Sequence, residues 1–406
     1  MILTSCAACA APLTHKAPQC GRCQTRYCGR PCQELHWKKG GHKAMCKKVK
    51  KGGGTEQYHA EKKYAEAVAV AVEACAEDTK GQTCYICTEA LHWKTKEGLV
   101  RGCACHTTEG FVHVSCLREQ AKILNDEAEE NNSGVKVRNA TWARWYSCGL
   151  CEKWYHGVVA CALGWACWKT YVGRPEEDGA RRSAMEVLAD AFSRNGDDKM
   201  ALMIYEARYD TERRLCASNF KERSNDDDMI DLQSYIASCC YNLGRHEEAL
   251  IARRTVYEQR LAKYGPMHED TIYAASGLAH SLVEDYWFAE AKRFLRDKIS
   301  NAQSVLGNRH RTTIILRLLY AQAVYIDDGS SFDEVQEAVA TLEDDCRTAR
   351  QVFGKDHPDH LQSRRALNQA RKRLAYEEAR LNSVDSTSEK LNRSLRIDGD
   401  DESEAP

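Results

Sequence analysis

The sequence lacks both a long apolar run and an N-terminal signal segment. Its most apolar stretch, Gly157 to Trp168, covers 12 residues between His156 and Lys169, whereas a helix that crosses a bilayer needs about 20. We therefore expect no membrane span, and we interpret this stretch as a buried helix that docks on its neighbours. The first residues contain no apolar segment with a cleavage site. The protein is therefore expected to be intracellular, in the cytoplasm or the nucleus.

Catalytic signatures and a strong net charge are lacking too. The sequence contains no glycine-rich phosphate loop, no G-x-S-x-G elbow and no H-E-x-x-H motif, so a binding protein is expected more than an enzyme. The formal net charge is −1, which gives no overall reason to expect nucleic acid or membrane as a partner. The charge is uneven, however, because residues 1–54 hold eleven Lys and Arg against one acidic residue.

Cysteine is abundant, and 14 of the 21 Cys lie in two clusters with His. The central cluster consists of four close pairs of potential metal ligands: Cys84 and Cys87, Cys103 and Cys105, His113 and Cys116, and Cys148 and Cys151. Each pair can direct two side chains to one tetrahedral zinc ion, so four pairs suggest two ions. Disulfides are the alternative reading of such spacing, but in a reducing compartment thiol pairs of this kind usually hold metal.

The upstream cluster has the sharpest motif of the chain. Its eight potential ligands are Cys6, Cys9, Cys20, Cys23, Cys28, Cys32, His42 and Cys46. Their spacing, with Tyr27 and the run His36-Trp37-Lys38, closely resembles the MYND zinc finger over about 41 residues. The resemblance implies two interleaved zinc sites, one on Cys6, Cys9, Cys28 and Cys32 and the other on Cys20, Cys23, His42 and Cys46. It also implies that the finger binds short peptides on partner proteins.

Three features of this finger allow two interpretations each. His36 is close enough to compete with His42 as a ligand, although the x3 spacing to Cys46 favours His42. Trp37 either contacts a peptide or packs over the metal. The lysine run 38–51 either contacts nucleic acid through phosphates or forms a basic face for solvent or an acidic peptide. The latter is favoured because no interleaved aromatics offer base stacking.

The order of ligands in the central cluster resembles the RING-variant (RING-CH) finger, a C4HC3 cross-brace. The resemblance implies one zinc on Cys84, Cys87, His113 and Cys116 and a second on Cys103, Cys105, Cys148 and Cys151. His106 could replace Cys105, but a thiolate is the better zinc ligand. The insert of residues 117–147 is longer than the family usually carries, and its first part, Leu117 to Glu130, is expected to be helical.

A ubiquitin ligase is the enzyme-class alternative that this resemblance raises. RING-type ligases recruit a ubiquitin-conjugating enzyme through an apolar residue in the first zinc loop, here Ile86, and often a Trp, here Trp142 or Trp145. Against it, no Pro follows Cys148, and the acidic Glu152 follows the last ligand. Ligase activity is therefore the less expected function.

From about Arg181 the sequence is helical and repetitive. Gly196-Asp-Asp-Lys-Met-Ala-Leu202 matches Gly244-Arg-His-Glu-Glu-Ala-Leu250, and a Gly-x-x-His marker precedes each later helix pair. The repeat resembles tetratricopeptide repeats (TPR) of the kinesin-light-chain type over about residues 184–375. Such helix pairs stack into a solenoid with a peptide-binding groove, and a plain helical bundle is the alternative.

These observations predict a mainly α fold, in which two small zinc-stapled cross-brace fingers precede an α-solenoid of TPR-like helix pairs. The expected segments are a MYND-type finger (1–51), a glycine linker and connecting helix (52–80), a RING-CH-like finger (81–156), a docking helix and linker (157–180), helical repeats with a capping helix that ends near Leu381 (181–381), and a disordered acidic tail (382–406). The expected function is a zinc-binding intracellular adaptor with about four zinc ions and with proteins or peptides as partners. A ubiquitin-conjugating enzyme is the partner only in the ligase alternative, and nucleic acid is not favoured.

Overall fold

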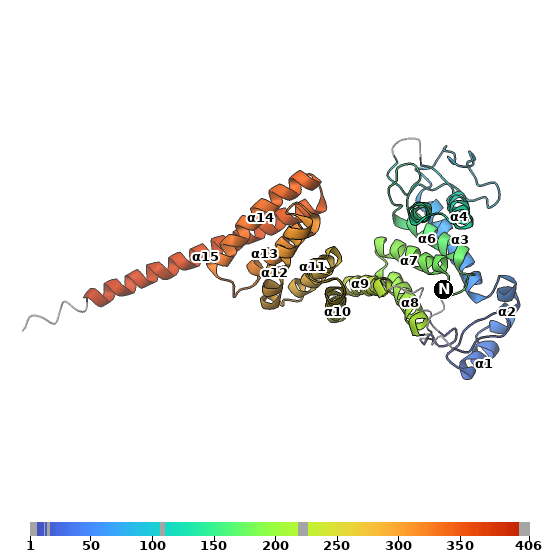
Figure 1. Ribbon diagram of the computed structural model, residues 1–406, viewed down its shortest axis with the longest axis horizontal. Helices are drawn as coiled ribbons and strands as arrows, with labels where there is room; N and C mark the ends of the chain where they lie inside the picture. Colours follow the sequence, from blue (N-terminus) through green and yellow to red (C-terminus); the bar gives the residue numbers. More distant parts are fainter. Residues whose placement is uncertain (1–5, 12, 14–16, 106–109, 218–225, 398–406) are drawn as a thin grey trace, which may run out of the picture. The chain divides into compact units, whose positions relative to one another are not determined.

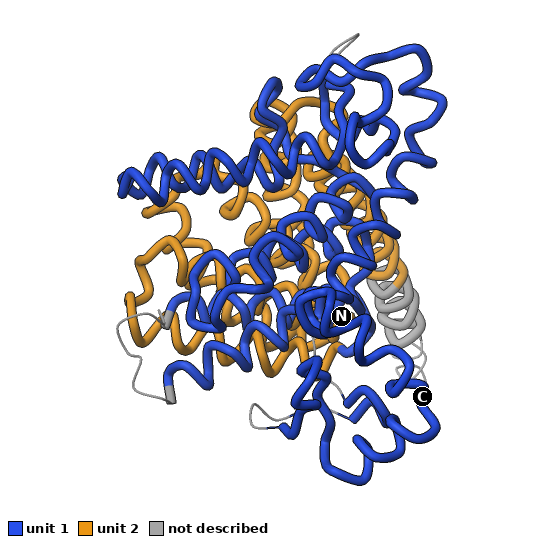
Figure 2. The backbone as a smooth tube through the Cα atoms, turned by 90° about the vertical axis from the view of Figure 1, so that its right-hand side faces the viewer, with its two compact units in different colours: residues 1–245 blue, residues 246–406 orange. Residues whose placement is uncertain are grey.

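A computed structural model of the chain describes residues 6–11, 13, 17–105, 110–217 and 226–397 (Figure 1). The chain divides into two compact units, residues 1–245 (unit 1) and 246–406 (unit 2) (Figure 2). Both are mainly helical, as predicted. Outside the helices, the described residues form isolated β-bridges rather than strands: Gln19 with Arg26, Val100 with Val112, and Ser147 with Trp154.

Unit 1 contains both cysteine clusters and the helices that surround them. Its helices, within the described residues, are α1 (Arg30–Lys38), α2 (His42–Lys51), α3 (Thr55–Ala74), α4 (Val114–Glu130), α5 (Val135–Trp142), the 3-10 helix η1 (Ala143–Trp145), α6 (Gly157–Tyr171), α7 (Gly179–Arg194), α8 (Asp198–Ala217) and α9 (Asp226–Asn242). The helix expected from Leu117 starts three residues earlier, at Val114, so that Cys116 lies in its first turn. The connecting helix ends at Ala74, six residues before the end of the expected segment 52–80.

Residues 52–54 form a hydrogen-bonded turn rather than a flexible glycine linker. The N–H of Gly54 donates to the carbonyl of Val49 at 3.1 Å, and Gly54 has φ of 98°, in the region that favours glycine. Directly after the turn, the N–H and the hydroxyl of Thr55 both donate to the carbonyl of Cys23, at 2.9 and 2.8 Å. Helix α3 is therefore tied to the N-terminal finger from its first residue.

Helix α6 is the buried docking helix that its composition predicted. Eleven of its fifteen residues are buried, because apolar side chains surround the whole helix rather than one face. Gly164 lies where α7 crosses, and a Cβ there would be 3.1 Å from the Cα of Leu188. On another side, Lys169 of α6 reaches α3, where its Nζ lies 2.8 Å from Glu61 and 4.0 Å from the ring centre of Tyr64. Helix α6 thus joins the connecting helix to the first helices of the repeat region.

Unit 2 consists of helix pairs that pack around aliphatic cores. Its helices are α10 (His246–Tyr264), α11 (Glu269–Glu284), α12 (Phe288–Leu306), α13 (Arg311–Ile326), α14 (Phe332–Phe353) and α15 (Pro358–Ile397). An alanine near the start of each of helices α8, α10, α12 and α14 is fully buried: Ala201, Ala249, Ala291 and Ala338. Small side chains at these positions let the helix axes approach closely.

A repeated loop begins the first helix of each later pair in unit 2. In each loop the imidazole Nδ1 accepts a hydrogen bond of 3.2 Å from the backbone N–H two residues later: His268 from Asp270, His310 from Thr312, and His357 from Asp359. Each histidine thus caps a helix N-terminus, where backbone donors have no partner inside the helix. The glycine three residues before it has positive φ in every case: Gly265, Gly307 and Gly354.

The helices of the expected array of residues 181–381 lie in both compact units, with α7, α8 and α9 in unit 1 and the later helices in unit 2. The expected end of the array needs correction. The last helix, α15, continues to Ile397 instead of ending near Leu381. No Pro or Gly occurs between Pro358 and Gly399, so nothing in the sequence interrupts the helix there. Residues 382–397, which were expected to belong to the disordered tail, are therefore part of α15. The rest of the expected tail, residues 398–406, lies outside the described residues.

Among the described residues, no helix combines the length and the apolarity that crossing a membrane demands.

Candidate metal centres

The four C-x2-C pairs share one backbone conformation. In each pair, the N–H four residues after the first Cys donates to the carbonyl of that Cys, at 2.8 to 3.0 Å. The residue at this fourth position has positive φ although none is a glycine: Ala10 (60°), Gln24 (61°), Thr88 (63°) and Glu152 (58°). The resulting tight loops turn the two sulfur atoms of each pair to the same side, as a shared metal requires.

Group A consists of Cys6, Cys9, Cys28 and Cys32, whose sulfur atoms all lie within 4.8 Å of one another. The Sγ atom of Cys28 is 3.6 Å from that of Cys9 and 3.4 Å from that of Cys32. Four sulfur ligands at about 2.3 Å from a tetrahedral zinc ion would be about 3.8 Å apart, so the group fits one ion. Cys9 and Cys28 are exposed, so this is the more open of the two groups in the finger.

Group B consists of Cys20, Cys23, His42 and Cys46, and all four are buried. The sulfur atoms of Cys20 and Cys46 are 3.8 Å apart, and Nε2 of His42 is 3.5 Å from the Sγ atom of Cys23. Burial, and to a lesser extent the neighbouring His36, lower the pKa of His42. A lowered pKa favours the neutral imidazole that a metal needs.

The two ambiguous side chains of the N-terminal finger have structural partners. Nδ1 of His36 lies 3.0 Å from the hydroxyl of the fully buried Tyr27, and His36 belongs to neither ligand group. Trp37 is half-buried, and its ring centre is 5.7 Å from that of His42. Trp37 therefore packs over group B. The lysines of α2 lie on its exposed side, opposite the buried Val49.

Group C consists of Cys84, Cys87, His113 and Cys116. Nδ1 of His113 is 3.4 Å from the Sγ atom of Cys87 and 3.6 Å from that of Cys116. Its other nitrogen, Nε2, lies 3.3 Å from the carbonyl oxygen of Ala90. A proton on Nε2, donated to that carbonyl, leaves the Nδ1 lone pair free for a metal.

Group D consists of Cys103, Cys105, Cys148 and Cys151. The sulfur atoms of Cys105 and Cys148 are 3.7 Å apart. A Cβ at position 110 would be 2.8 Å from the Cβ of Cys105, and Gly110 has φ of 92°. Glycine is therefore needed for the chain to pass this group. The competing His106 lies outside the described residues.

The protonation of the thiols makes metal loading dependent on pH. Burial by itself raises the pKa of Cys6, but backbone N–H groups of Cys28, Ala8 and Cys9 outweigh it and lower the pKa to about 6. In the same group, hydrogen bonding among the thiols raises the pKa of Cys32 to about 12. A metal that enters group A must therefore displace protons, and acid should release it.

The groups are suited to holding structure rather than to catalysis. Each offers four protein ligands, three or four of them sulfur, a set that suits zinc and leaves no position for an activated water. The four groups could thus hold four zinc ions. The two tryptophans considered for ligase activity gain no support: Trp145 is fully buried, and Trp142 packs against Tyr171 with ring centres 5.3 Å apart. Ile86 is partly exposed.

Sequence reasoning overlooked a fifth loop with the same backbone as the C-x2-C pairs. In it, the N–H of Lys96 donates to the carbonyl of His92 at 2.9 Å, and the N–H of His92 donates to Glu97 at 3.0 Å. Lys96 has φ of 59°, and Nδ1 of His92 accepts from the N–H of Thr95 at 3.1 Å. An imidazole replaces the sulfur acceptor here. The sequence gave little sign of this loop, because no Cys begins it and the residue with positive φ, Lys96, is not a glycine.

Comparisons with known proteins give one family match and several similar solved structures. The family profile of the MYND finger matches residues 6–46. A comparison with curated proteins finds no match. Among solved structures, BtubC (BKLC) from P. vanneervenii is similar at 13% identity and a TM-score of 0.42, over 72% of this chain and 92% of that one. A protein from Podosopora anserina, described as a kinesin light chain with nearly identical TPR-like repeats, is similar at 16% identity and a TM-score of 0.39, over 60% of this chain and 99% of that one.

Proposed function

We propose that this protein is an intracellular adaptor, in which zinc holds the fingers of residues 1–51 and 81–156 and the helical unit 2 binds an acidic segment of a partner protein. In this proposal groups A, B, C and D each bind one zinc ion through the residues named above. Zinc binding supplies folding free energy directly, which small domains with few apolar residues need. The metals keep the surfaces of unit 1 in place, and recognition depends on those surfaces and on unit 2.

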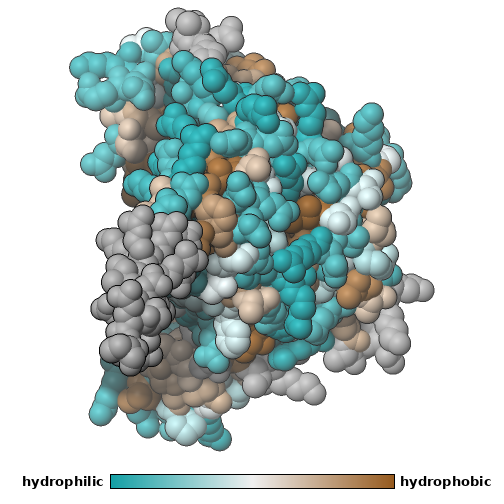
Figure 3. All heavy atoms as spheres, turned by 90° about the vertical axis from the view of Figure 1, so that its left-hand side faces the viewer, coloured by the Kyte–Doolittle hydropathy of each residue, from teal (hydrophilic) through white to brown (hydrophobic). Residues whose placement is uncertain are grey.

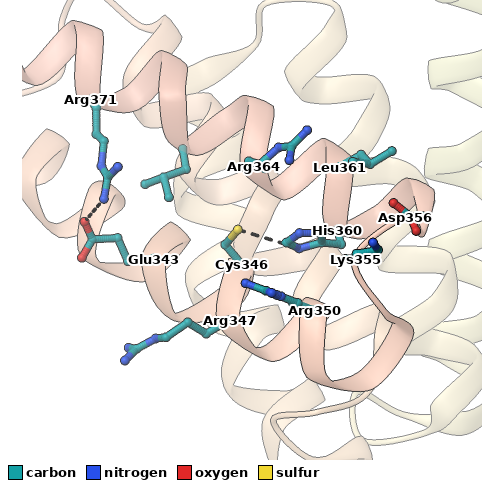
Figure 4. Close-up of a pocket in the computed structure, with 11 residues that line it drawn as sticks. Glu343, Cys346, Arg347, Arg350, Lys355, Asp356, His360, Leu361, Arg364 and Arg371 are labelled. Carbon is teal, nitrogen blue, oxygen red and sulfur yellow. Dashed lines mark hydrogen bonds and ion pairs between the residues drawn. The ribbon is translucent and has the colours of Figure 1, made fainter.

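A cationic pocket between α14 and α15 is the observation that carries the proposal. Its volume is about 700 Å³, and Figure 4 shows its lining side chains. Five cationic and two acidic residues line it: Arg347, Arg350, Lys355, Arg364 and Arg371, with Glu343 and Asp356. Such an excess of positive charge around one cavity attracts a segment of opposite charge.

Several of these cations are available to a ligand. Glu343 is already paired with Arg371, at 2.7 Å. Within the described part of the chain, no ion pair involves Arg350, Lys355 or Arg364. Arginine and lysine without an internal carboxylate partner favour carboxylates or phosphates from outside.

A thiol and an imidazole also line the pocket, together with Leu361 and Leu367. Cys346 of α14 and His360 of α15 face each other there, with Sγ and Nδ1 3.8 Å apart (Figure 4). On the face of the molecule in Figure 3, hydrophilic residues cover most of the described surface, with hydrophobic residues interspersed. A partner that binds the face drawn in Figure 3 would use charged contacts more than a large apolar patch.

The test is the binding of a fluorescein-labelled peptide of alternating Glu and Ala to the full chain, measured by fluorescence anisotropy. We expect the double variant Arg350→Ala, Arg364→Ala to weaken binding at least about tenfold, and rising salt to weaken binding to the wild type. Arg365→Ala is the matched control, because Arg365 is exposed on α15 and does not line the pocket. Equal binding by all three proteins, or no binding by the wild type, would contradict the proposal.

A further inference from the structure

A second cavity lies in unit 1, between the central finger and α7. Its volume is about 280 Å³. Three aromatic side chains of the finger region line it, and on α7 it is lined by polar and charged residues: Trp142, Tyr146 and Trp154, with Ser183, Glu186, Asp190 and Arg194, beside the buried Val187. Pockets for drug-sized ligands run from about 300 to 1,000 Å³, so this one suits a single side chain.

The aromatic residues are held in place by their neighbours. The rings of Tyr146 and Trp154 meet edge to face, with centres 5.9 Å apart. Trp142 packs against Tyr171 and approaches the buried Trp145, with ring centres 6.5 Å apart. Trp154 is nevertheless 59% exposed, so an entering group can reach it.

One ring of the cavity already accepts a cation from the chain itself. The guanidinium carbon of Arg194 lies 4.4 Å from the ring centre of Trp154. The face of an aromatic ring attracts cations electrostatically within about 6 Å. The arginine is exposed and is itself one of the residues that line the cavity. The face of the Trp154 ring is therefore suited to positive charge.

The two carboxylates of the cavity differ in their partners. Asp190 accepts a hydrogen bond from the hydroxyl of Tyr205 and is near the charge of Arg194. No hydrogen bond or ion pair involves the half-buried Glu186 in the described part of the chain. The charge of Arg208 on α8 acts on Glu186 without a direct ion pair, so a cation from outside can still pair with this carboxylate.

We propose that this cavity binds the head group of an N-methylated lysine carried by a partner protein. Methyl groups make an ammonium ion bulkier and easier to take out of water, and aromatic rings bind such ions through their faces. The small volume excludes a larger ligand, and the unpaired carboxylate of Glu186 supplies the opposite charge. The inference rests on the proposed function only in that a partner protein carries the lysine.

The test is isothermal titration calorimetry of the zinc-loaded full chain with the peptide Gly-Lys-Gly, unmodified or trimethylated on lysine, and with tetramethylammonium as the free head group. We expect the trimethylated peptide to bind at least about fivefold tighter than the unmodified one. Trp154→Ala and Glu186→Gln should each weaken its binding by a similar factor, with zinc content unchanged.

Trp93→Ala is the matched control, since Trp93 is 67% exposed in the same finger and does not line the cavity. Equal affinity for both peptides, equal binding by Trp154→Ala and wild type, or no binding at millimolar concentration would overturn the inference. Because the acidic-peptide test depends on residues of unit 2, either proposal can fail without the other.

The pH dependence offers a second readout for Glu186. Burial, with the nearby Asp190, raises the pKa of Glu186 to about 7; Arg208 of α8 opposes this and Asp228 and Asp231 of α9 add to it. A proton on Glu186 competes with the ligand cation, so affinity should rise as pH increases through about 7. In Glu186→Gln this rise should disappear.

Discussion

The zinc fingers of unit 1 and the helix pairs of unit 2 are stabilised by different chemistry. In the N-terminal finger, the buried apolar cluster is made largely of the cysteines themselves, with Tyr27 and Val49. In unit 2, each of two buried clusters joins mostly aliphatic residues of successive helices, one from Tyr257 to Ala323 and the other from Leu318 to Ala370. The fingers depend on metal to bring distant loops together, whereas the helix pairs depend on the burial of apolar surface.

The comparison extends to the backbone. Each C-x2-C loop holds a residue other than glycine at positive φ, a conformation that costs free energy for residues with a side chain. In the repeated loops of unit 2, the residue with positive φ is a glycine. A histidine three residues later caps the helix that follows. The strained position therefore recurs in all four C-x2-C loops, whereas in unit 2 it occurs outside the repeated loops, at Tyr286.

Breaking one metal site gives the largest effect that the comparison predicts. Cys23→Ala should remove one of about four zinc ions and unfold residues 6–51, because zinc binding contributes on the order of 10 kcal/mol to such folds. Unit 2 should keep its stability. Zinc content by elemental analysis and hydrogen exchange resolved along the chain would measure both effects.

Cys346→Ala is the control for that experiment, because Cys346 lies in unit 2 outside the four groups. It should retain the full zinc content. Four zinc ions in Cys23→Ala, or lost protection in unit 2, would show that metal and packing are not separate supports.

A buried carboxylate should make the stability of unit 2 depend on pH. Asp345 is fully buried, with Oδ1 3.1 Å from Nε of Arg317. Burial raises the pKa of Asp345 to about 7, although Arg317 opposes the rise. The folded state therefore holds a proton that the unfolded state has lost, and the free energy of unfolding should fall as pH rises from about 4 to about 7, by at most about 4 kcal/mol.

Asp345→Asn should remove this slope and make unit 2 more stable at neutral pH, as urea unfolding at several pH values would show. Arg317 keeps a partner in the variant, because Asp344 lies 3.0 Å away. Asp344→Asn, at an exposed position, serves as the comparison and should reduce the slope only in part, because burial rather than Asp344 is the main cause of the raised pKa of Asp345. If the free energy of unfolding of Asp345→Asn still fell with rising pH as in the wild type, the pH dependence would come from a group other than Asp345.

The smallest predicted effect concerns the repeated histidine cap. His310→Ala removes the acceptor for the N–H of Thr312 and should lower the free energy of unfolding of unit 2 by about 1 kcal/mol. His310→Asn, which restores a short polar acceptor, should recover most of the loss. Thermal unfolding of the two variants and the wild type would test this, and a loss in both variants would point to packing of the ring instead.

Local patterns could be read from the sequence, and contacts between distant segments could not. The spacing identified close pairs of ligands, since two ligands in one short loop can share an ion. The resemblance to the MYND finger implied that Cys20, Cys23, His42 and Cys46 form one set, and the fold brings these four side chains together. The helix pairs followed from periodicity. The aromatic cavity combines Trp154 with Glu186, and no local rule relates two residues on separate elements.

Element ends were also poorly predicted, for two different reasons. Residues 52–54 suggested flexibility by composition, but the bonds of Gly54 and Thr55 to the finger form only in the folded chain. The end of α15 was placed near Leu381 although no helix-breaking residue occurs before Gly399.

The backbone conformation of the C-x2-C loops could not be predicted either. Thr88 and Glu152 gave no sign of positive φ, because neither is the glycine that usually signals it.

The interleaving of ligands has a consequence for the timing of synthesis. Group D closes only when Cys151 joins Cys103 and Cys105, and a ribosome that adds about 5–20 residues per second needs roughly 2 to 10 s to reach it. During that interval two thiols wait beside an incomplete site, open to oxidation or to another metal. The supply of zinc while the nascent chain emerges should therefore influence how much protein reaches the native state.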